Sequence, residues 1–372
     1  PPRSTLFPYT TLFRSLASLM VGREVIFNLD KCEQTAGPEI LRLEDVCALN
    51  NKNLPALRNV DLALHEGEIL GIAGVAGNGQ SELVEVITGL RPCTGRIWLE
   101  GKDIANKPPS FSISQGLAHI PEDRIGVGTA PNLSLTSNII MKRYDQEPIS
   151  QKWQLNYMAA DNLALGLKIE YDIQSPDVHT QARKLSGGNL QKLILARELS
   201  STPRLVVAMQ PTRGLDVGAI ESVQQLLLQQ RAQGCAILLV SEDLDELLSL
   251  SDRIAVMYEG RVVGVVCSQD FDITQIGLMM TGTPPQDMPG KGQSEEFPAQ
   301  SAASSFDEVL EGLRHYEESA QAELPSESES PVEEPPQLEP ATQPEEPLLN
   351  LTEKERVLRK VLGEKYKRGD DE

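Results

Sequence analysis

Long apolar runs, close cysteine pairs and basic charge are all scarce in this chain. No window approaches the roughly 18 consecutive apolar residues of a membrane-spanning helix, so any membrane role would depend on a partner. The five cysteines lack the close spacing of a zinc or redox site, which favours a reduced, cytoplasmic setting. A net charge of −20 argues against a nucleic-acid-binding surface.

The acidic charge gathers in a polar tail at 283–372. From Asp287 onward there are about 22 acidic and 9 basic residues, so roughly −13 of the net −20 lies there. The tail is rich in Pro, Glu and Ser and cannot bury enough apolar surface to order itself, so we predict disorder. Two stretches, 305–319 and 351–367, place a capping-box pattern before apolar residues at helical spacing. They are predicted either as docking helices or as transient helices, because isolated helices of this length are marginal in water.

Between residues 39 and 282, apolar runs typical of buried strands alternate with helical patterns. This alternation predicts an α/β fold, and a hydrophobic content of 40% is sufficient for a core. The expected strands are EILGIAG (68–74), LAHIP (117–121), RLVVAMQ (204–210), AILLVS (236–241) and RIAVMYEG (253–260).

A glycine-rich turn joins a predicted strand to a predicted helix in GIAGVAGNGQSELVEVITGL (71–90). In that context backbone N–H groups and a helix N-terminus point at a bound phosphate. The phosphate-loop pattern G-x-x-x-x-G-K-[ST] is met at Gly74, Gly79 and Ser81, but Gln80 stands at the lysine position. Glutamine can donate a hydrogen bond but lacks the charge that makes such bonds roughly twice as strong. Taken alone, the motif is also compatible with an ordinary strand–turn–helix.

The candidate nucleotide-binding residues are Gly74, Gly77, Asn78, Gly79, Gln80, Ser81 and Glu82. Ser81 is the candidate Mg²⁺ contact.

A second helix start suited to an anion occurs in KLSGGNLQKLILAREL (184–199), followed closely by a strand in RLVVAMQPTRGLDVGA (204–219). Taken together, these motifs resemble the nucleotide-binding subunits of ABC transporters, whose signature is LSGG followed by a polar residue. An ordinary helix cap is the alternative. The candidate signature residues are Leu185, Ser186, Gly187, Gly188 and Asn189.

Four phrases make the resemblance more specific: GEILGIAGVAGNGQSEL (67–83), IPEDR (120–124), LSGGNLQK (185–192) and QPTRGLDVGA (210–219). They look like the second of two fused nucleotide-binding modules in the bacterial simple-sugar and nucleoside importers. The resemblance implies an ABC-type P-loop module over 39–282. Its mixed sheet would be joined by an antiparallel β subdomain and by a helical subdomain at about 129–200. ATP and Mg²⁺ are the implied cofactors.

The same resemblance marks positions where the residues of a working catalytic site are replaced, Gln80 being one of them. The strand that would end in Asp-Glu, to support Mg²⁺ and to polarise water, ends in Met209 and Gln210. Glu242 corresponds to the switch histidine, and Glu122 to the glutamine that senses the γ-phosphate. No aromatic residue near 50–57 is available to stack on adenine. We therefore expect weak nucleotide binding and negligible hydrolysis by this half alone, because a general base is worth about 10²–10⁴ in rate.

In the importer family each ATP lies between the phosphate loop of one module and the signature of the other. The resemblance thus implies that this signature closes over the γ-phosphate held by a missing first module, with Asp216 at the module interface. Segment 129–169 would grip a membrane permease at the cytoplasmic face of the bacterial cell membrane, and an extracytoplasmic solute-binding lipoprotein would serve the same system.

The motif details favour nucleosides over pentoses and hexoses as the solute. A soluble ABC ATPase acting on ribosomes or DNA would need basic surfaces or coiled-coil heptads, and the sequence offers neither. A regulatory protein without a transport role is a further alternative.

The first fifteen residues, PPRSTLFPYTTLFRS, set aromatic residues among threonines in a chain that is only 4% aromatic. All fifteen can be reverse-translated in one frame into a common sequencing-library adapter. We therefore interpret 1–15 as an artefact rather than as a targeting peptide or a strand. The following LASLMVGREVIF (16–27) echoes QIGLMMTG (275–282), a phrase that also ends the first module in fused importers. We expect 16–38 to be an inter-module linker.

Overall fold

The computed structural model describes residues 36–151, 154–267 and 272–283. The predicted artefact, almost all of the predicted linker and the acidic tail with its two predicted helices lie outside the described residues. No helix in the described part is both long and apolar enough to cross a membrane.

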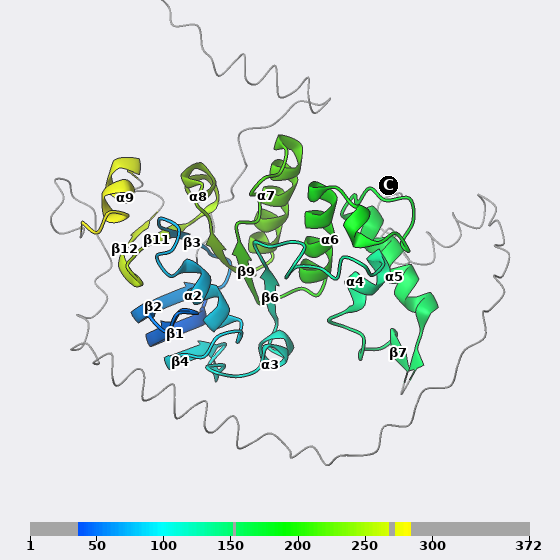
Figure 1. Ribbon diagram of the computed structural model, residues 1–372, viewed down its shortest axis with the longest axis horizontal. Coiled ribbons are helices and arrows are strands. Elements are labelled where there is room, and N and C mark those ends of the chain that lie inside the picture. Colours follow the sequence, from blue (N-terminus) through cyan, green and yellow to red (C-terminus); the bar gives the residue numbers. More distant parts are fainter. Residues whose placement is uncertain (1–35, 152–153, 268–271, 284–372) are drawn as a thin grey trace, which may run out of the picture. The chain divides into compact units, whose positions relative to one another are not determined.

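A six-stranded sheet forms the centre of the described fold (Figure 1). Its order is β12 (Arg261–Cys267), β11 (Arg253–Tyr258), β3 (Ile69–Ala73), β10 (Ala236–Val240), β9 (Leu205–Met209) and β6 (Leu117–Ile120). β12 pairs antiparallel with β11, and the other pairs are parallel. Every residue of β3 and β10 is buried, as expected for strands covered on both faces. The five apolar runs predicted as strands are confirmed within one or two residues at each end.

A second, four-stranded sheet is antiparallel throughout. Its order is β2 (Pro55–His65), β1 (Glu39–Leu49), β4 (Thr94–Leu99) and β5 (Lys102–Asp103). Leu41 and Leu62 of this sheet share one apolar core with Leu70 and Leu238 of the central sheet. Helix α2 (Gln80–Ile87) contributes Leu83 to the same core, which fixes the helix that follows the glycine-rich turn.

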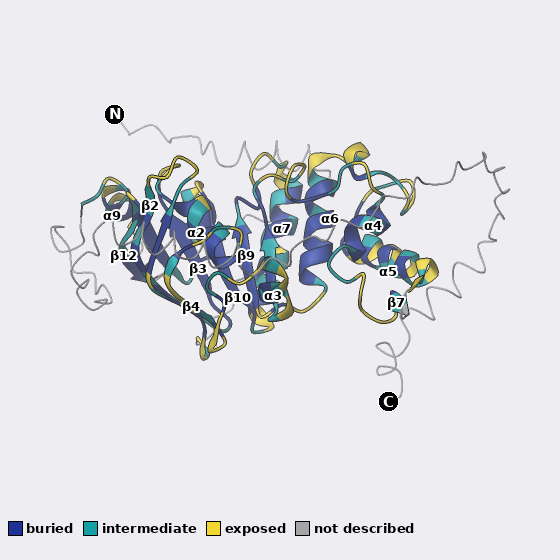
Figure 2. Ribbon diagram, turned by 60° about the horizontal axis from the view of Figure 1, so that its bottom comes forward, coloured by how far each residue is buried: buried dark blue, intermediate teal, exposed yellow. Residues whose placement is uncertain are grey.

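Helices α6 (Gly187–Leu199), α7 (Val217–Ala232), α8 (Leu244–Leu250) and α9 (Ile273–Met279) share the other apolar core with the central sheet. A short helix, α3 (Pro109–Ser114), precedes β6. Figure 2 shows α6 as largely buried, and its apolar residues from Leu190 to Leu199 are all in the core. The burial of α6 anchors the signature at its N-terminus to the rest of the domain.

The predicted helical insert contains α4 (Leu135–Ile140) and α5 (Tyr157–Glu170), but it is not entirely helical. A two-stranded hairpin of β7 (Ser150–Gln151) and β8 (Gln154–Leu155) lies between them, and a 3-10 turn, Ala182–Lys184, precedes α6. The hairpin strands are two residues long, too short to produce a recognisable alternation in the sequence. Only Ala160, Ala164 and Leu167 of α5 are buried, so most of this helix faces solvent (Figure 2).

Candidate functional site

The carboxyl ends of four neighbouring parallel strands lie along one edge of the central sheet. The order β3, β10, β9, β6 places the loops after these strands side by side, which is where open α/β sheets bind ligands. The loops after β10, β9 and β6 carry Glu242, Gln210 and Glu122, which are predicted to replace catalytic residues, and Gln80 begins α2 directly after the loop that follows β3. The structure therefore brings together four residues that are far apart in the sequence.

The glycine-rich turn has the backbone that a phosphate loop requires. Gly77 and Gly79 have φ values of +88° and +100°, and a Cβ on Gly79 would lie 2.5 Å from the carbonyl oxygen of Ala56. Glycine is thus needed at residue 79 for both its backbone conformation and its close contact. No side chain caps the N-terminus of α2, so the turn keeps the form of an anion-binding helix start.

Gln80 closes this loop with its own side chain. Its Oε1 accepts a hydrogen bond from the Asn78 amide at 3.1 Å, and its Nε2 donates to the Val75 carbonyl at 3.1 Å. Gln80 is buried, and a Cβ built on Gly74 would lie 2.5 Å from Nε2. A neutral amide therefore occupies the inside of the turn, and a phosphate would have to displace both hydrogen bonds without gaining a positive charge.

The donors at this edge are a poor match for Mg²⁺. Ser81 is exposed in the first turn of α2, but Met209 ends β9 and packs against the apolar core. A thioether is not a ligand for Mg²⁺, which prefers carboxylate, carbonyl and water oxygens. No group of three or more His, Cys, Asp and Glu side chains within the described residues could hold a metal ion.

Gln210 joins the ends of β9 and β10. Its backbone adopts φ +49°, its N–H donates to the Val240 carbonyl at 2.8 Å, and its side-chain Oε1 accepts from the Glu242 amide at 3.4 Å. Gln210, which is predicted to replace the catalytic carboxylate, therefore has a neutral side chain whose oxygen is bonded to the Glu242 amide. It cannot act as a base.

Glu246 is a carboxyl group at this edge that the sequence reasoning did not identify. It is buried, and its Oε1 accepts from the Thr212 hydroxyl at 2.8 Å. Burial raises the pKa of Glu246, against the effect of the hydrogen bond from Thr212. Being buried and bonded to Thr212, it ties α8 to the loop after β9 and is not accessible to a reacting water. Glu246 stands in a polar segment four residues after Glu242, and nothing in that segment of the sequence indicated its contact with Thr212.

Glu122 forms an ion pair with Arg213, whose Nη1 donates to the Glu122 carboxylate. The loops after β6 and β9 are therefore linked by opposite charges. Both side chains are partly exposed, so the ion pair itself contributes little to stability. It also engages the carboxylate of Glu122, which is predicted from the sequence to stand at the position of the γ-phosphate sensor. The sequence around Glu122 and around Arg213 gave no indication that the two residues would pair.

The signature forms a well-defined helix start. Ser186 is the N-cap of α6, and its Oγ accepts from the Asn189 amide at 3.4 Å and from its side-chain Nδ2 at 2.9 Å. Asp216 caps α7 in the same way, accepting from the Ala219 amide at 2.9 Å. A Cβ built on Gly188 would lie 3.8 Å from Asp216 Oδ2, so the two helix starts are neighbours. Leu185 packs against the core immediately before them.

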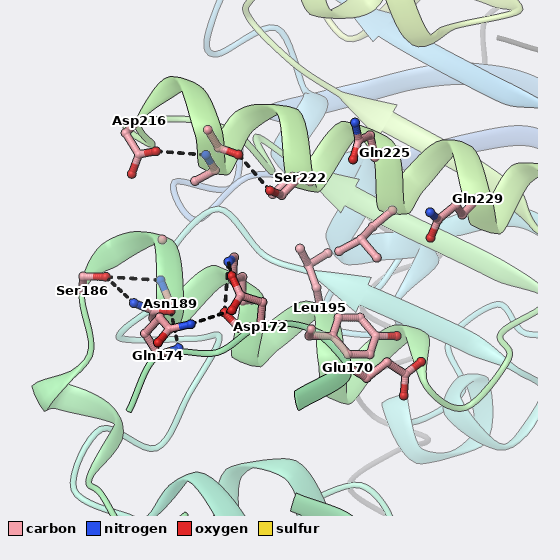
Figure 3. Close-up of a pocket in the computed structure, with 17 residues that line it drawn as sticks. Glu170, Asp172, Gln174, Ser186, Asn189, Leu195, Asp216, Ser222, Gln225 and Gln229 are labelled. Carbon is pink, nitrogen blue, oxygen red and sulfur yellow. Dashed lines mark hydrogen bonds and ion pairs between the residues drawn. The ribbon is translucent and has the colours of Figure 1, made fainter. Parts of the chain in front are cut away.

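A cavity of about 650 Å³ lies between α6, α7 and the end of α5 (Figure 3). Ser186 and Asp216 lie at one end of it, and Gln229 at the other. Lys192 lines its wall, with Nζ bonded to Asp172 at 2.9 Å. No lining residue comes from 74–82, so the signature and the phosphate loop do not share this cavity.

Comparison with known proteins places these features in a family context. Residues 57–213 match the family model described as ABC transporter. The chain is 47% identical over 270 residues to the glucose import ATP-binding protein TsgD13 of Haloferax volcanii. It is 45% identical over 269 residues to the guanosine import ATP-binding protein NupO of Bacillus subtilis, and 39% identical over 270 residues to the nucleoside import ATP-binding protein NupA of Lactococcus lactis. Each match covers 72% of this chain but only 49%, 53% and 53% of those proteins, so the chain spans about half the length of the curated relatives it matches.

Solved structures with a similar fold include a nucleotide-free ATP-binding cassette from an ABC transporter. It matches with a TM-score of 0.55 at 23% identity. The match covers 66% of this chain and 96% of the cassette. A dimeric cassette in a post-hydrolysis state, bound to ADP and Pi, has a TM-score of 0.52 at 22% identity, covering 62% of this chain and all of that one. At these identities the likeness concerns the fold alone, and it confirms the predicted fold class.

Proposed function

Since this chain belongs to the ABC transporter family through its ATP-binding domain, we propose that it serves an importer that carries nucleosides through a membrane permease. The observation that carries this proposal is its identity of 45% and 39% to proteins named for guanosine and nucleoside import. A simple-sugar importer is the second candidate, favoured by the 47% identity to a protein named for glucose import. A regulatory ABC protein without a permease is the third.

The site at the sheet edge supports the proposal that this chain does not hydrolyse ATP by itself. Gln80 fills the loop where a lysine would bind phosphate, and Gln210 stands where a catalytic carboxylate would polarise water. The loss of a general base alone costs about 10²–10⁴ in rate, and each lost electrostatic contact adds to that. Turnover at this site would be negligible.

The intact signature supports a different role. Ser186 caps the start of this buried helix, and Gly187 and Gly188 place their backbone amides in its first turn, beside Asp216. We propose that this surface completes an ATP site whose phosphate loop and Mg²⁺ ligands belong to a first nucleotide-binding module. That the chain spans about half the length of its relatives is consistent with a tandem arrangement.

The outer face of the insert supports a permease contact. Tyr157 and Met158 at the start of α5 and Ile169 near its end are 71%, 76% and 55% exposed, so each is accessible to a partner protein. In this proposal the domain lies at the cytoplasmic face of the cell membrane. A solute-binding lipoprotein would deliver the solute from the other side.

We expect ATP-driven uptake of guanosine when the chain, its first module and the permease of its own system are reconstituted in vesicles. Labelled guanosine, ribose and glucose are compared in the same preparation. Uptake of ribose or glucose without guanosine would replace the nucleoside proposal by the sugar alternative. Failure of the chain to co-purify with any permease would reject the transport role.

A further inference from the structure

Arg124, at the end of the IPEDR phrase, contacts two other elements at once. Its Nε donates to Gln191 Oε1 in α6 at 2.8 Å, and its Nη2 donates to the backbone carbonyl of Arg213 in the loop after β9. Gln191 is fully buried in the second turn of the signature helix. One guanidinium therefore links the loop after β6, the signature helix and the loop that leads to Asp216.

The backbone around Arg124 is tightly constrained. Asp123 Oδ1 accepts from the amides of Ile125 and Gly126, and the Thr129 hydroxyl donates to the Arg124 carbonyl at 2.8 Å. A Cβ on Gly128 would lie 2.7 Å from Ile194 Cδ1 of α6 and 2.9 Å from the Arg124 carbonyl oxygen. The loop is thus packed directly on α6, and Arg124 has little freedom to move away from it.

Arg124 also lies against the signature itself. A Cβ built on Gly187 would be 4.0 Å from Arg124 Nη1. We propose that Arg124 is a positioning residue for the signature, holding the first turns of α6 in a fixed place relative to the loop that carries Asp216. The signature would then present a rigid surface to the nucleotide of the first module. This inference rests on the proposed role of the signature in that site.

The contacts require arginine rather than any cation. A guanidinium is planar and presents several N–H donors in a rigid fork, so it can reach a side-chain oxygen on one side and a carbonyl on another. Lysine keeps the charge but has a single ammonium group on a flexible chain. The side chain of Arg213 pairs separately with Glu122, and Arg124 bonds to the backbone of Arg213 and not to its side chain.

Hydrogen–deuterium exchange of the purified chain tests the structural part. In Arg124→Ala we expect the amides of Leu190 and Gln191 to exchange about tenfold faster, because hydrogen bonds of a charged group are lost. Arg124→Lys should behave like Arg124→Ala, while Arg213→Ala, which keeps its backbone carbonyl, should change these amides much less. Arg42→Ala removes an exposed arginine paired with Glu44 and serves as the control. Unchanged exchange in Arg124→Ala, or an equal effect of Arg213→Ala, would overturn the proposal.

ATP turnover in the assembly with the first module tests the functional part. Arg124→Ala should lower kcat by about tenfold and leave KM for ATP nearly unchanged, because the first module holds the nucleotide. A signature variant, Gly188→Asp, is measured beside it. If Gly188→Asp has no effect, the proposed role of the signature fails whatever Arg124 does. If Gly188→Asp abolishes turnover and Arg124→Ala leaves kcat unchanged, only the role of Arg124 fails.

Discussion

We expect the Gly188→Asp substitution to abolish ATP turnover when this chain is assembled with a first module whose phosphate loop is complete. Gly188 lies in the first turn of α6, where free backbone amides favour an anion. A carboxylate there would occupy the place of the phosphate and add a second negative charge close to Asp216, 3.8 Å from the new Cβ. Loss of a single oxyanion-binding donor costs about 10²–10³ in rate, so we expect at least a hundredfold loss.

The matched control is Gly188→Ala. Its Cβ would lie 3.4 Å from the Cβ of Ala219, which is ordinary van der Waals contact, so the methyl group should fit and turnover should fall far less. An acidic residue in the first turn interacts favourably with the helix dipole, which offsets its repulsion by Asp216, so Gly188→Asp should change the thermal unfolding midpoint only slightly. Turnover by Gly188→Asp equal to that of Gly188→Ala would show that the signature carries no anion.

Replacing Glu198 by alanine should lower the free energy of unfolding by about 3–5 kcal/mol, the usual cost of breaking a buried ion pair from one side. Its carboxylate is 2% exposed and accepts from Lys142 Nζ at 2.7 Å and from Arg197 Nε at 2.8 Å. It also accepts from the His119 amide at 3.2 Å. Glu198 thus joins α6, the segment after α4 and strand β6, and its loss leaves two cations without their shared partner.

Urea unfolding of Glu198→Ala and Glu44→Ala at several pH values measures this effect. Glu44 also pairs with an arginine, at 2.6 Å, but is 39% exposed, so its loss should cost no more than about 1 kcal/mol. Burial alone would raise the pKa of Glu198, but Lys142 and Arg197 outweigh it and hold the pKa below its ordinary value of 4.5. Its contribution is therefore complete above pH 4.5 and is lost as the pH falls toward the folded pKa. A difference between the two variants that did not shrink in acid would contradict this assignment.

The strands and both helix starts could be predicted because local patterns determine them. The run AILLVS (236–241) is buried on both faces of the sheet, and Ser186 caps α6 where its hydroxyl meets the amide three residues later. The antiparallel subdomain was predicted from the family resemblance and is confirmed. The hairpin β7–β8 was missed because two-residue strands have no readable periodicity.

The contacts of the site could not be predicted, because they join residues distant in the sequence. Arg213 meets Glu122 across 91 positions and Arg124 meets Gln191 across 67. Gln80 was expected to offer a hydrogen bond to phosphate, but its Nε2 donates to the carbonyl of Val75 within its own loop. Whether a polar side chain is free for a ligand depends on its neighbours in space, which the motif alone does not define.

Phosphate release from ATP, measured for the chain alone and after addition of a complete first module, tests the central claim most directly. Each measurement is made with the unchanged chain and with its Ser81→Ala variant. We predict that the chain alone releases no phosphate above background. We also predict that the assembly turns over ATP at a rate that Ser81→Ala does not change, because the working phosphate loop belongs to the first module. Robust hydrolysis by the chain alone, abolished by Ser81→Ala, would contradict the account.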